Sequence, residues 1–147
     1  MTLVAAIDAH EFKIRVEDDN TPGTFVPKCM INTERSLSVE AQTTGTAIVD
    51  CDDPSKPNTP RNRVVSVSHN LAGAGTFHKT EHKFFLDWIA SGDPKNIKAG
   101  QTGVGEEVIA GAYLLTSYQV TGSDKDTMTA SMAFTQYGAV ANTTNVA

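Results

Sequence analysis

Cysteine and positive charge are both scarce in this chain of 147 residues. The two cysteines, Cys29 and Cys51, are too few for a disulfide framework, and their spacing does not fit a metal site. We therefore expect both side chains to be small buried residues. With 12 Lys and Arg against 17 Asp and Glu, the formal net charge is −5. An acidic chain is a poor candidate for binding nucleic acid through its phosphates, because that requires Lys and Arg.

Long apolar segments and aromatic side chains are also scarce. No stretch approaches the roughly 20 apolar residues of a membrane span, and the N-terminus lacks the basic region of a signal peptide. We expect a protein made in the cytoplasm that does not insert into a membrane. Hydrophobic content of 39% and aromatic content of 7% are low for an enzyme-like core. This balance favours sheets with one polar face, or a surface covered by copies of the same chain.

Residues 79–91 predict the single helix of the chain. Phe85, Trp88 and Ile89 follow the three-and-four spacing of an amphipathic helix. Gly92 suits the left-handed position that follows a helix end. Because the only Trp of the chain lies here, we expect Phe85, Trp88 and Ile89 to be the core-facing residues of a helix that packs on a sheet.

Most of the remaining sequence alternates with the period of a β-strand. The clearest segments are residues 12–16, 25–31, 35–41, 63–70, 96–99, 108–121 and 127–136. In residues 108–121 we expect Leu114, Thr116 and Tyr118 to share one face of the strand. The chain is therefore predicted to be mainly β, a β-sandwich or barrel with a single flanking helix at about residues 79–91. One domain would span residues 1–147.

Three segments lack a clear periodic pattern. Residues 42–62 are rich in Asp and Pro and poor in apolar residues, so we expect a long loop. It could be a solvated excursion or an interaction loop ordered by a neighbouring subunit. Residues 1–10 are expected to form an N-terminal arm, and residues 139–147 a polar C-terminal tail.

One pattern points to enzymatic chemistry. His78, Glu81 and His82 match the H-x-x-E-H motif of a class of zinc proteases, in which two His hold the metal and Glu activates a water. No third ligand on a second helix is evident, and polar residues are expected in the first turn of any helix. We therefore interpret the match as accidental.

Two further patterns could bind ions or phosphates. The glycine runs at 73–75 and 100–105 are not followed by Lys-Ser/Thr, so turns explain them. Asp50, Asp52 and Asp53 lack the glycine and the downstream Glu of a calcium loop. We expect no catalytic residue, no metal site and no cofactor, and hence a protein that is not an enzyme.

Taken in order, the segments resemble the major tail tube proteins of long, non-contractile phage tails and of phage-like gene transfer agents. The resemblance is carried by residues 12–16, 48–54, 71–75, 85–92, 111–118, 124–126 and 127–138. It implies a structural, self-assembling virion protein that forms stacked homo-hexameric rings around a channel for DNA delivery. It also implies synthesis in the bacterial cytoplasm and assembly in the tail of a particle.

The resemblance implies partners and assigns the 42–62 loop to contacts with the next ring or subunit. Expected partners are further copies of the chain, the tape-measure, tail-terminator and baseplate proteins, and DNA in transit without specific binding. Candidates for inter-subunit contacts are Thr43, Asp50, Asp52, Asp53, Lys56, Arg61 and Arg63. An acidic lumen would repel the DNA backbone, and the candidates for lining it are Glu40, Glu106, Glu107, Asp124 and Asp126.

Two other functions fit the same predicted architecture. A type VI secretion-like tube protein would share it but carry effectors in place of DNA. A β-sandwich ligand-binding module, for instance for carbohydrate, would need a surface row of aromatic side chains. Here the Trp and most Phe are predicted to be internal.

Overall fold

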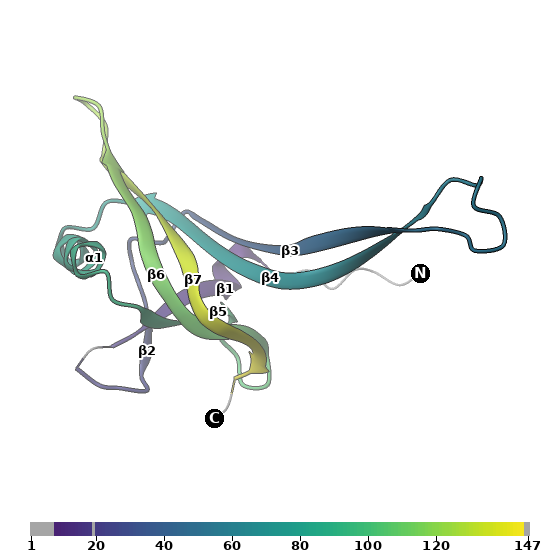
Figure 1. The fold of residues 1–147 in the computed structure, drawn as a ribbon. Coiled ribbons are helices and arrows are strands. Elements are labelled where there is room, and N and C mark those ends of the chain that lie inside the picture. Colours follow the sequence, from purple (N-terminus) through teal and green to yellow (C-terminus); the bar gives the residue numbers. More distant parts are fainter. Residues whose placement is uncertain (1–7, 19, 146–147) are drawn as a thin grey trace, which may run out of the picture.

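One antiparallel sheet of seven strands makes up most of the fold, in the order β2-β1-β5-β6-β7-β4-β3 (Figure 1). The computed structural model describes residues 8–18 and 20–145. In chain order its elements are η1 (Ala9–Glu11), β1 (Phe12–Glu17), β2 (Phe25–Pro27), β3 (Glu34–Ile48), β4 (Thr59–Thr76), α1 (Lys79–Ser91), β5 (Lys95–Gln101), β6 (Glu107–Thr121) and β7 (Thr129–Thr144). The predicted mainly β fold with a single α-helix is confirmed, and the sheet is not closed within the chain.

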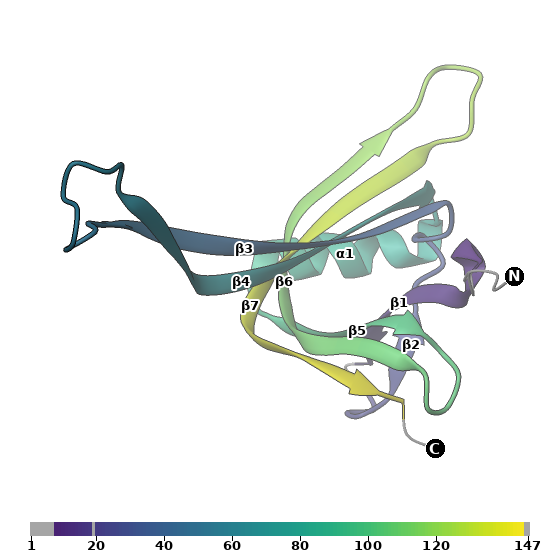
Figure 2. The same cartoon turned by 90° about the vertical axis from the view of Figure 1, so that its right-hand side faces the viewer.

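The sheet folds over on itself because β6 and β7 are long and curved (Figure 2). One layer contains β3, β4 and the ends of β6 and β7 that meet at their shared turn. The other layer contains β1, β2, β5 and the opposite ends of β6 and β7. The core between them is formed mainly by Ile14, Val16, Ile97, Tyr113 and Phe134, all of which are buried.

Irregular pairing in β6 changes which side chains face the core. The register with β7 shifts between Gly111 and Tyr113 and again between Leu115 and Ser117. A β-bulge adds one residue to a strand and so moves the following side chains to the other face. Tyr113 and Leu115 are therefore buried. The prediction that Leu114, Thr116 and Tyr118 share one face is wrong.

Helix α1 lies against the sheet through its aromatic side chains. Phe85 and Trp88 are buried, and Ile89 packs against the core. The Phe85 ring stacks on Tyr118 with centroids 5.6 Å apart, and the Trp88 ring lies 5.4 Å from that of Phe134.

The helix ends at Gly92, as its sequence predicts. Gly92 has a φ of 69°, and its N–H donates to the carbonyl oxygen of Trp88. The indole Nε1 of Trp88 donates to the carbonyl oxygen of Asp93 at 2.9 Å. Both bonds tie the chain after the helix back to its last turn.

The most prominent feature is a long hairpin that projects from the body (Figure 1). We call residues 38–70 the arm, because there β4 pairs with β3 only, and its pairing with β7 begins at Leu71. The prediction of a loop over residues 42–62 is corrected by this hairpin, since only residues 49–58 lie outside its strands. Pro60 is tolerated within β4 because the other edge of the strand is open there.

Three smaller expectations also change. Cys29 and Cys51 are both exposed, because each lies in a connecting segment and not in a strand of the core. The expected C-terminal tail from residue 139 belongs to β7 as far as Thr144, where it pairs with β6. Of the strand expected at residues 25–31, only Phe25–Pro27 is extended.

The expected N-terminal arm lies mostly outside the described residues, which begin at Asp8. In the part of the chain that the structure describes, no helix is long and apolar enough to cross a membrane.

Candidate assembly surfaces

One face of the arm is apolar and lacks a cover in the described part of the chain. Cross-strand pairing places Ala41 opposite Val67 and Thr43 opposite Val64, on the side of the sheet that carries α1. Val39 lies on the same side and is 52% exposed, while Val64 and Val67 are 55% and 46% exposed. We call Val39, Ala41, Val64 and Val67 the apolar arm face. A contiguous exposed apolar strip of this kind marks an interaction surface.

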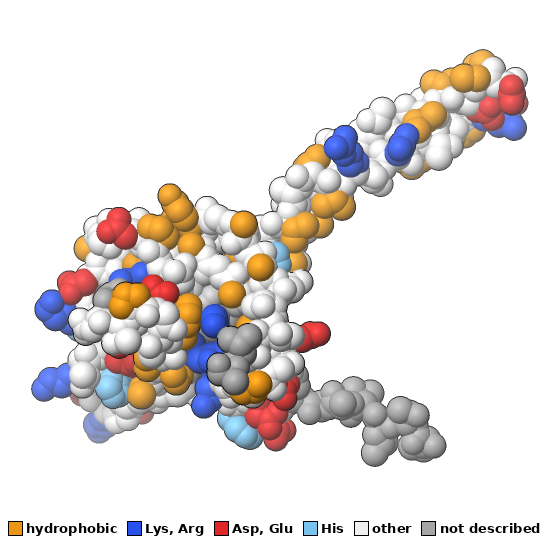
Figure 3. All heavy atoms as spheres, turned by 90° about the horizontal axis from the view of Figure 1, so that it is seen from below, with side chains coloured by type: hydrophobic (Ala, Val, Ile, Leu, Met, Phe, Trp, Pro, Cys, Tyr) orange, Lys and Arg blue, Asp and Glu red, His pale blue; other side chains and the backbone are white. Residues whose placement is uncertain are grey.

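The opposite side of the same layer is polar and carries no helix. Pairing places there the following side chains: Glu34, Ser36, Ser38, Glu40, Gln42, Thr44 and Thr46 of β3; Arg61, Arg63, Ser66 and Ser68 of β4; Thr129, Ser131 and Thr135 of β7; Gln119 of β6. We call these residues the helix-free face. Hydroxyl groups predominate in it, and Glu34 and Glu40 are its only carboxylates. Figure 3 shows the arm projecting from the body, with basic side chains along its length and acidic ones near its tip.

The layer that carries the arm has two open edges. Its strands lie in the order β6-β7-β4-β3, and no strand in the described part of the chain pairs with the outer edge of β3. On the other side, the pairing of β5 with β6 ends at Tyr113, which leaves Leu114–Thr121 without a neighbour on that edge. Unpaired N–H and C=O groups along such edges favour pairing with another chain.

The tip of the arm is a compact acidic turn. The carboxylate of Asp50 accepts a hydrogen bond from the backbone N–H of Asp52 at 3.0 Å and lies 3.8 Å from the Lys56 ammonium. The carbonyl oxygen of Asp53 accepts a hydrogen bond from the backbone N–H of Lys56. These predicted contact residues therefore lie together at the tip. Thr43, Arg61 and Arg63 lie further back along the strands of the arm.

The acidic residues predicted for the lumen are not brought together within one subunit. Glu40 lies on the helix-free face. Glu106 and Glu107 lie where β6 begins, whereas Asp124 and Asp126 lie in the turn after β6 ends. Two pairs at opposite ends of one strand cannot form one acidic cluster in a single copy.

The zinc-protease motif is explained by structural contacts. The carboxylate of Glu81 accepts hydrogen bonds from the backbone N–H groups of Cys29 and Met30, at 3.1 and 2.8 Å. His82 Nδ1 lies 2.9 Å from the hydroxyl of Tyr118. Glu81 therefore fastens the segment after β2 to the helix, and His82 packs against Phe77 and Tyr118, so structural contacts account for two of the three side chains of the motif.

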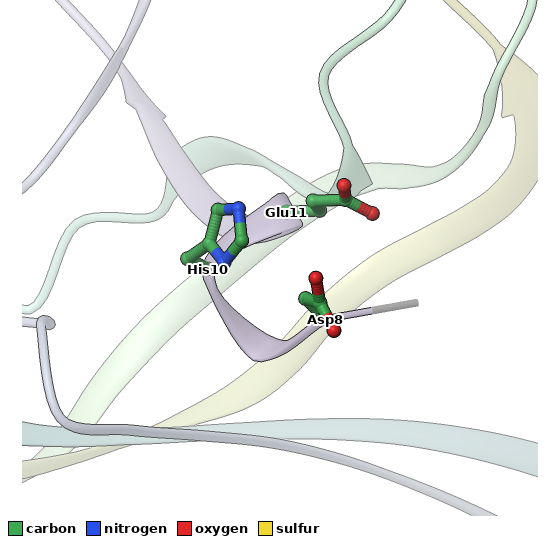
Figure 4. Close-up of side chains that lie close together, drawn as sticks. All are labelled: Asp8, His10 and Glu11. Carbon is green, nitrogen blue, oxygen red and sulfur yellow. The ribbon is translucent and has the colours of Figure 1, made fainter. Parts of the chain in front are cut away.

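Another cluster, which the sequence analysis did not single out, surrounds η1 (Figure 4). Potential ligand atoms of Asp8, His10 and Glu11 lie within 4.8 Å of one another, and all three residues are exposed. Exposed acidic groups commonly gather at a short turn. The cluster alone therefore does not indicate a metal site.

Asn145 is a structural residue that the sequence did not reveal. It is buried, its Nδ2 donates to the carbonyl oxygens of Gln101 and Gly103, and its Oδ1 accepts from Arg15. These bonds hold the glycine-rich turn between β5 and β6 against the end of β7, which positions Glu106 and Glu107. Burial lowers the pKa of the Arg15 guanidinium. The contact joins residues 130 positions apart.

The family described as "Phage tail tube protein" matches residues 8–142. The chain belongs to this family. No curated protein sequence matches this chain. Because the members of this family are tail tube proteins, it is a structural subunit and not an enzyme.

Solved structures with the same fold come from assembled particles. A chain of the tail of an empty gene transfer agent particle, refined with C6 symmetry, has a TM-score of 0.72 at 15% identity, covering 94% of this chain and 99% of that one. A chain of the native gene transfer agent virion gives 0.71 at 16% identity, with the same coverage. The SPP1 tail tube gives a TM-score of 0.69 at 10% identity, and the alignment covers 97% of this chain and 81% of the SPP1 chain. At these identities the likeness shows a common fold.

Proposed function

We propose that this tail tube protein forms hexameric rings that stack into a tube, whose channel carries DNA during delivery. The observation that carries the proposal is the four-stranded layer β6-β7-β4-β3, which is open at both edges. The six-fold symmetry of the similar gene transfer agent tail supports the number of copies in a ring.

Strand direction allows such a ring to close. Each strand of the layer is antiparallel to its neighbour, so β3 runs antiparallel to β6 of the same copy. Rotation about the ring axis keeps the direction of every strand along that axis. The β6 edge of the next copy would therefore meet β3 in antiparallel orientation. Closure of the ring joins both open edges of this four-stranded layer in every copy, which gives one continuous barrel.

The arm supplies a second contact between copies. Its apolar face would be covered by a neighbouring copy, since nothing in the described part of its own chain covers it. We assign the tip, with Asp50, Asp52, Asp53 and Lys56, to contacts with the next ring. Thr43 would lie beside the apolar arm face in the same interface. Tape-measure, terminator and baseplate proteins would bind at the ends of the tube.

With the open edges joined, the two sides of the layer become the outside and the inside of the tube. Because α1 covers one side, the helix-free face would line the channel. Its hydroxyl groups and Glu40 would present DNA with a polar surface that has few strong binding groups. Glu106, Glu107, Asp124 and Asp126 would add negative charge near the two ends of each ring, where like charge repels the DNA backbone.

The test is assembly of the purified protein, followed by size-exclusion chromatography with light scattering and by negative-stain electron microscopy. Wild-type protein is expected to form six-fold rings or tubes. Val64→Asn with Val67→Asn removes apolar contact from the arm, at about 1.5 kcal/mol or more for each Val. Assembly should then require a roughly 100-fold higher protein concentration, since each 1.4 kcal/mol is tenfold.

The matched control is Ser66→Asn with Ser68→Asn, on the same strand and the opposite face. This variant should assemble like the wild type. Monomers at high concentration for the wild-type protein, or equal effects of the two double variants, would contradict the proposal.

A further inference from the structure

We propose that Arg61 and Arg63 form an anion-binding band that contacts the phosphates of nucleic acid in the channel. This inference rests on the proposed tube, and it adds a binding site to a face that otherwise consists mainly of hydroxyl groups. The sequence alone grouped both arginines with the contacts between subunits. Their position on the arm points to the channel.

Both arginines project from the helix-free face of the arm. Arg61 lies opposite Thr46 and Arg63 opposite Thr44. Because Asn62 between them faces the other side of the strand, the two arginines are neighbours on the same face. Together with Ile48 the two arginines and the two threonines line a hollow of about 510 Å³. The hollow thus offers two guanidinium groups, each able to bind a phosphate through two N–H donors, beside two hydroxyl groups.

The two arginines have no carboxylate partner in the described part of the chain. The ion pairs there include Lys56 with Asp50, His78 with Glu81 and Lys83 with Asp87, and neither arginine takes part in one. Glu40, the nearer carboxylate of the helix-free face, lies four positions along β3 from Thr44, or about 13 Å. The distance is measured along the backbone, and no ion pair joins Glu40 to either arginine in the described residues. Two unpaired cations side by side are notable in a chain with a net charge of −5.

The amphipathic character of the arm determines which way they point. Val64 and Val67 lie on the opposite side of the same strand, and a neighbouring copy would cover that side. Arg61 and Arg63 would then be left facing the channel. Six copies would arrange them as a ring of cations. Contacts to phosphate oxygens carry no sequence preference, and they permit sliding.

The experiment uses assembled tubes and a short fluorescent DNA duplex as the probe. Sedimentation of the tubes measures the bound duplex over a series of salt concentrations. Arg61→Gln with Arg63→Gln removes two cations from the arm. Lys79→Gln with Lys125→Gln is the control, because it removes the same charge from exposed positions outside the helix-free face. Anisotropy of the duplex with unassembled subunits provides a measurement that does not depend on tube formation.

Wild-type tubes should retain the duplex at low salt, with an affinity that falls as salt rises. In the arginine variant, the slope of log affinity against log salt should decrease by about 2 or more, while the lysine control keeps the wild-type slope. Equal slopes in the two double variants would overturn the inference. Loss of ring formation in the arginine variant alone would also overturn it and assign both residues to contacts between copies. Failure of the wild-type protein to form tubes would instead count against the proposed function.

Discussion

Tyr113 is a residue whose buried hydroxyl lowers the stability of the folded state. Its side chain is fully buried in the core, and its hydroxyl has no hydrogen-bond partner among the described residues. Burial raises the pKa of this hydroxyl to about 12. A buried hydroxyl without a partner destabilises the folded state, because it loses its bonds to water and gains none in return.

Tyr113→Phe is therefore expected to stabilise the subunit by about 1 kcal/mol at neutral pH. The wild-type protein should also lose stability as the pH rises from about 10 to about 12. In that range the unfolded tyrosine ionises near its ordinary pKa of about 10, whereas the folded one stays protonated, so ionisation favours unfolding. Urea unfolding of both proteins across this pH range measures the effect. The loss should be smaller in the Phe variant, and an equal or steeper loss there would contradict the assignment.

The roles of other single residues depend on partners far away in the sequence. Glu81 binds backbone N–H groups about 50 positions earlier, and Asn145 joins β7 to the turn between β5 and β6. The sequence shows that Glu81 is polar and near a helix start, but not which segment will lie beside it. Such contacts follow from the folded sheet, so they could not be predicted from spacing.

At the scale of elements, α1 was predictable because its signals are local. The three-and-four spacing, Gly92 and the proline after it all lie within a few residues. Strands were predictable at the base of the arm, in residues 35–41 and 63–70, but not in its outer part, because neither face there is buried by the described part of the chain. The outer strands mix Ser, Thr, Val and charged residues, and Pro60 adds a turn signal. If the partner surface of such a strand lies on another subunit, the strand can have the composition of a loop.

Helix α1 should be the element on which the stability of the body depends most. Trp88→Ala removes the ring contact with Phe134 and the hydrogen bond to Asp93. We expect a loss of about 3–5 kcal/mol in the free energy of unfolding. The control is Leu86→Ala on the exposed side of the helix, where the side chain is 44% exposed. Urea denaturation should show a much smaller loss for the control, and equal losses would contradict this role of the helix.

At the scale of the whole molecule, the proposed ring closure would place β3 of one copy beside β6 of the next. Within one copy, Ser38 and Gln119 lie on strands separated by β7 and β4, about 14 Å apart across the sheet. A disulfide requires Cα atoms within about 7 Å. Cysteines introduced at these positions can therefore pair only between copies.

The prediction is made for the variant Ser38→Cys with Gln119→Cys, in a background where Cys29 and Cys51 are replaced by Ser. Mild oxidation should give covalent multimers on a non-reducing gel, in a ladder that ends at six subunits. Because the register of the two edges is not specified by one copy, Ser117→Cys and Thr121→Cys are tested in place of the change at Gln119. Each single-cysteine variant serves as control and should give no species larger than a dimer. A ladder absent from all three double variants would argue against edge pairing.

The arm projects from only one end of the strand layer, and every ring would carry it in the same direction. A tube built this way always offers a fresh attachment surface at its growing end, identical to the one just occupied. Rotation around the axis closes on itself, but translation along the axis does not. In such a tube the subunit would have no means of counting rings, and a different molecule would have to measure the length of the tube.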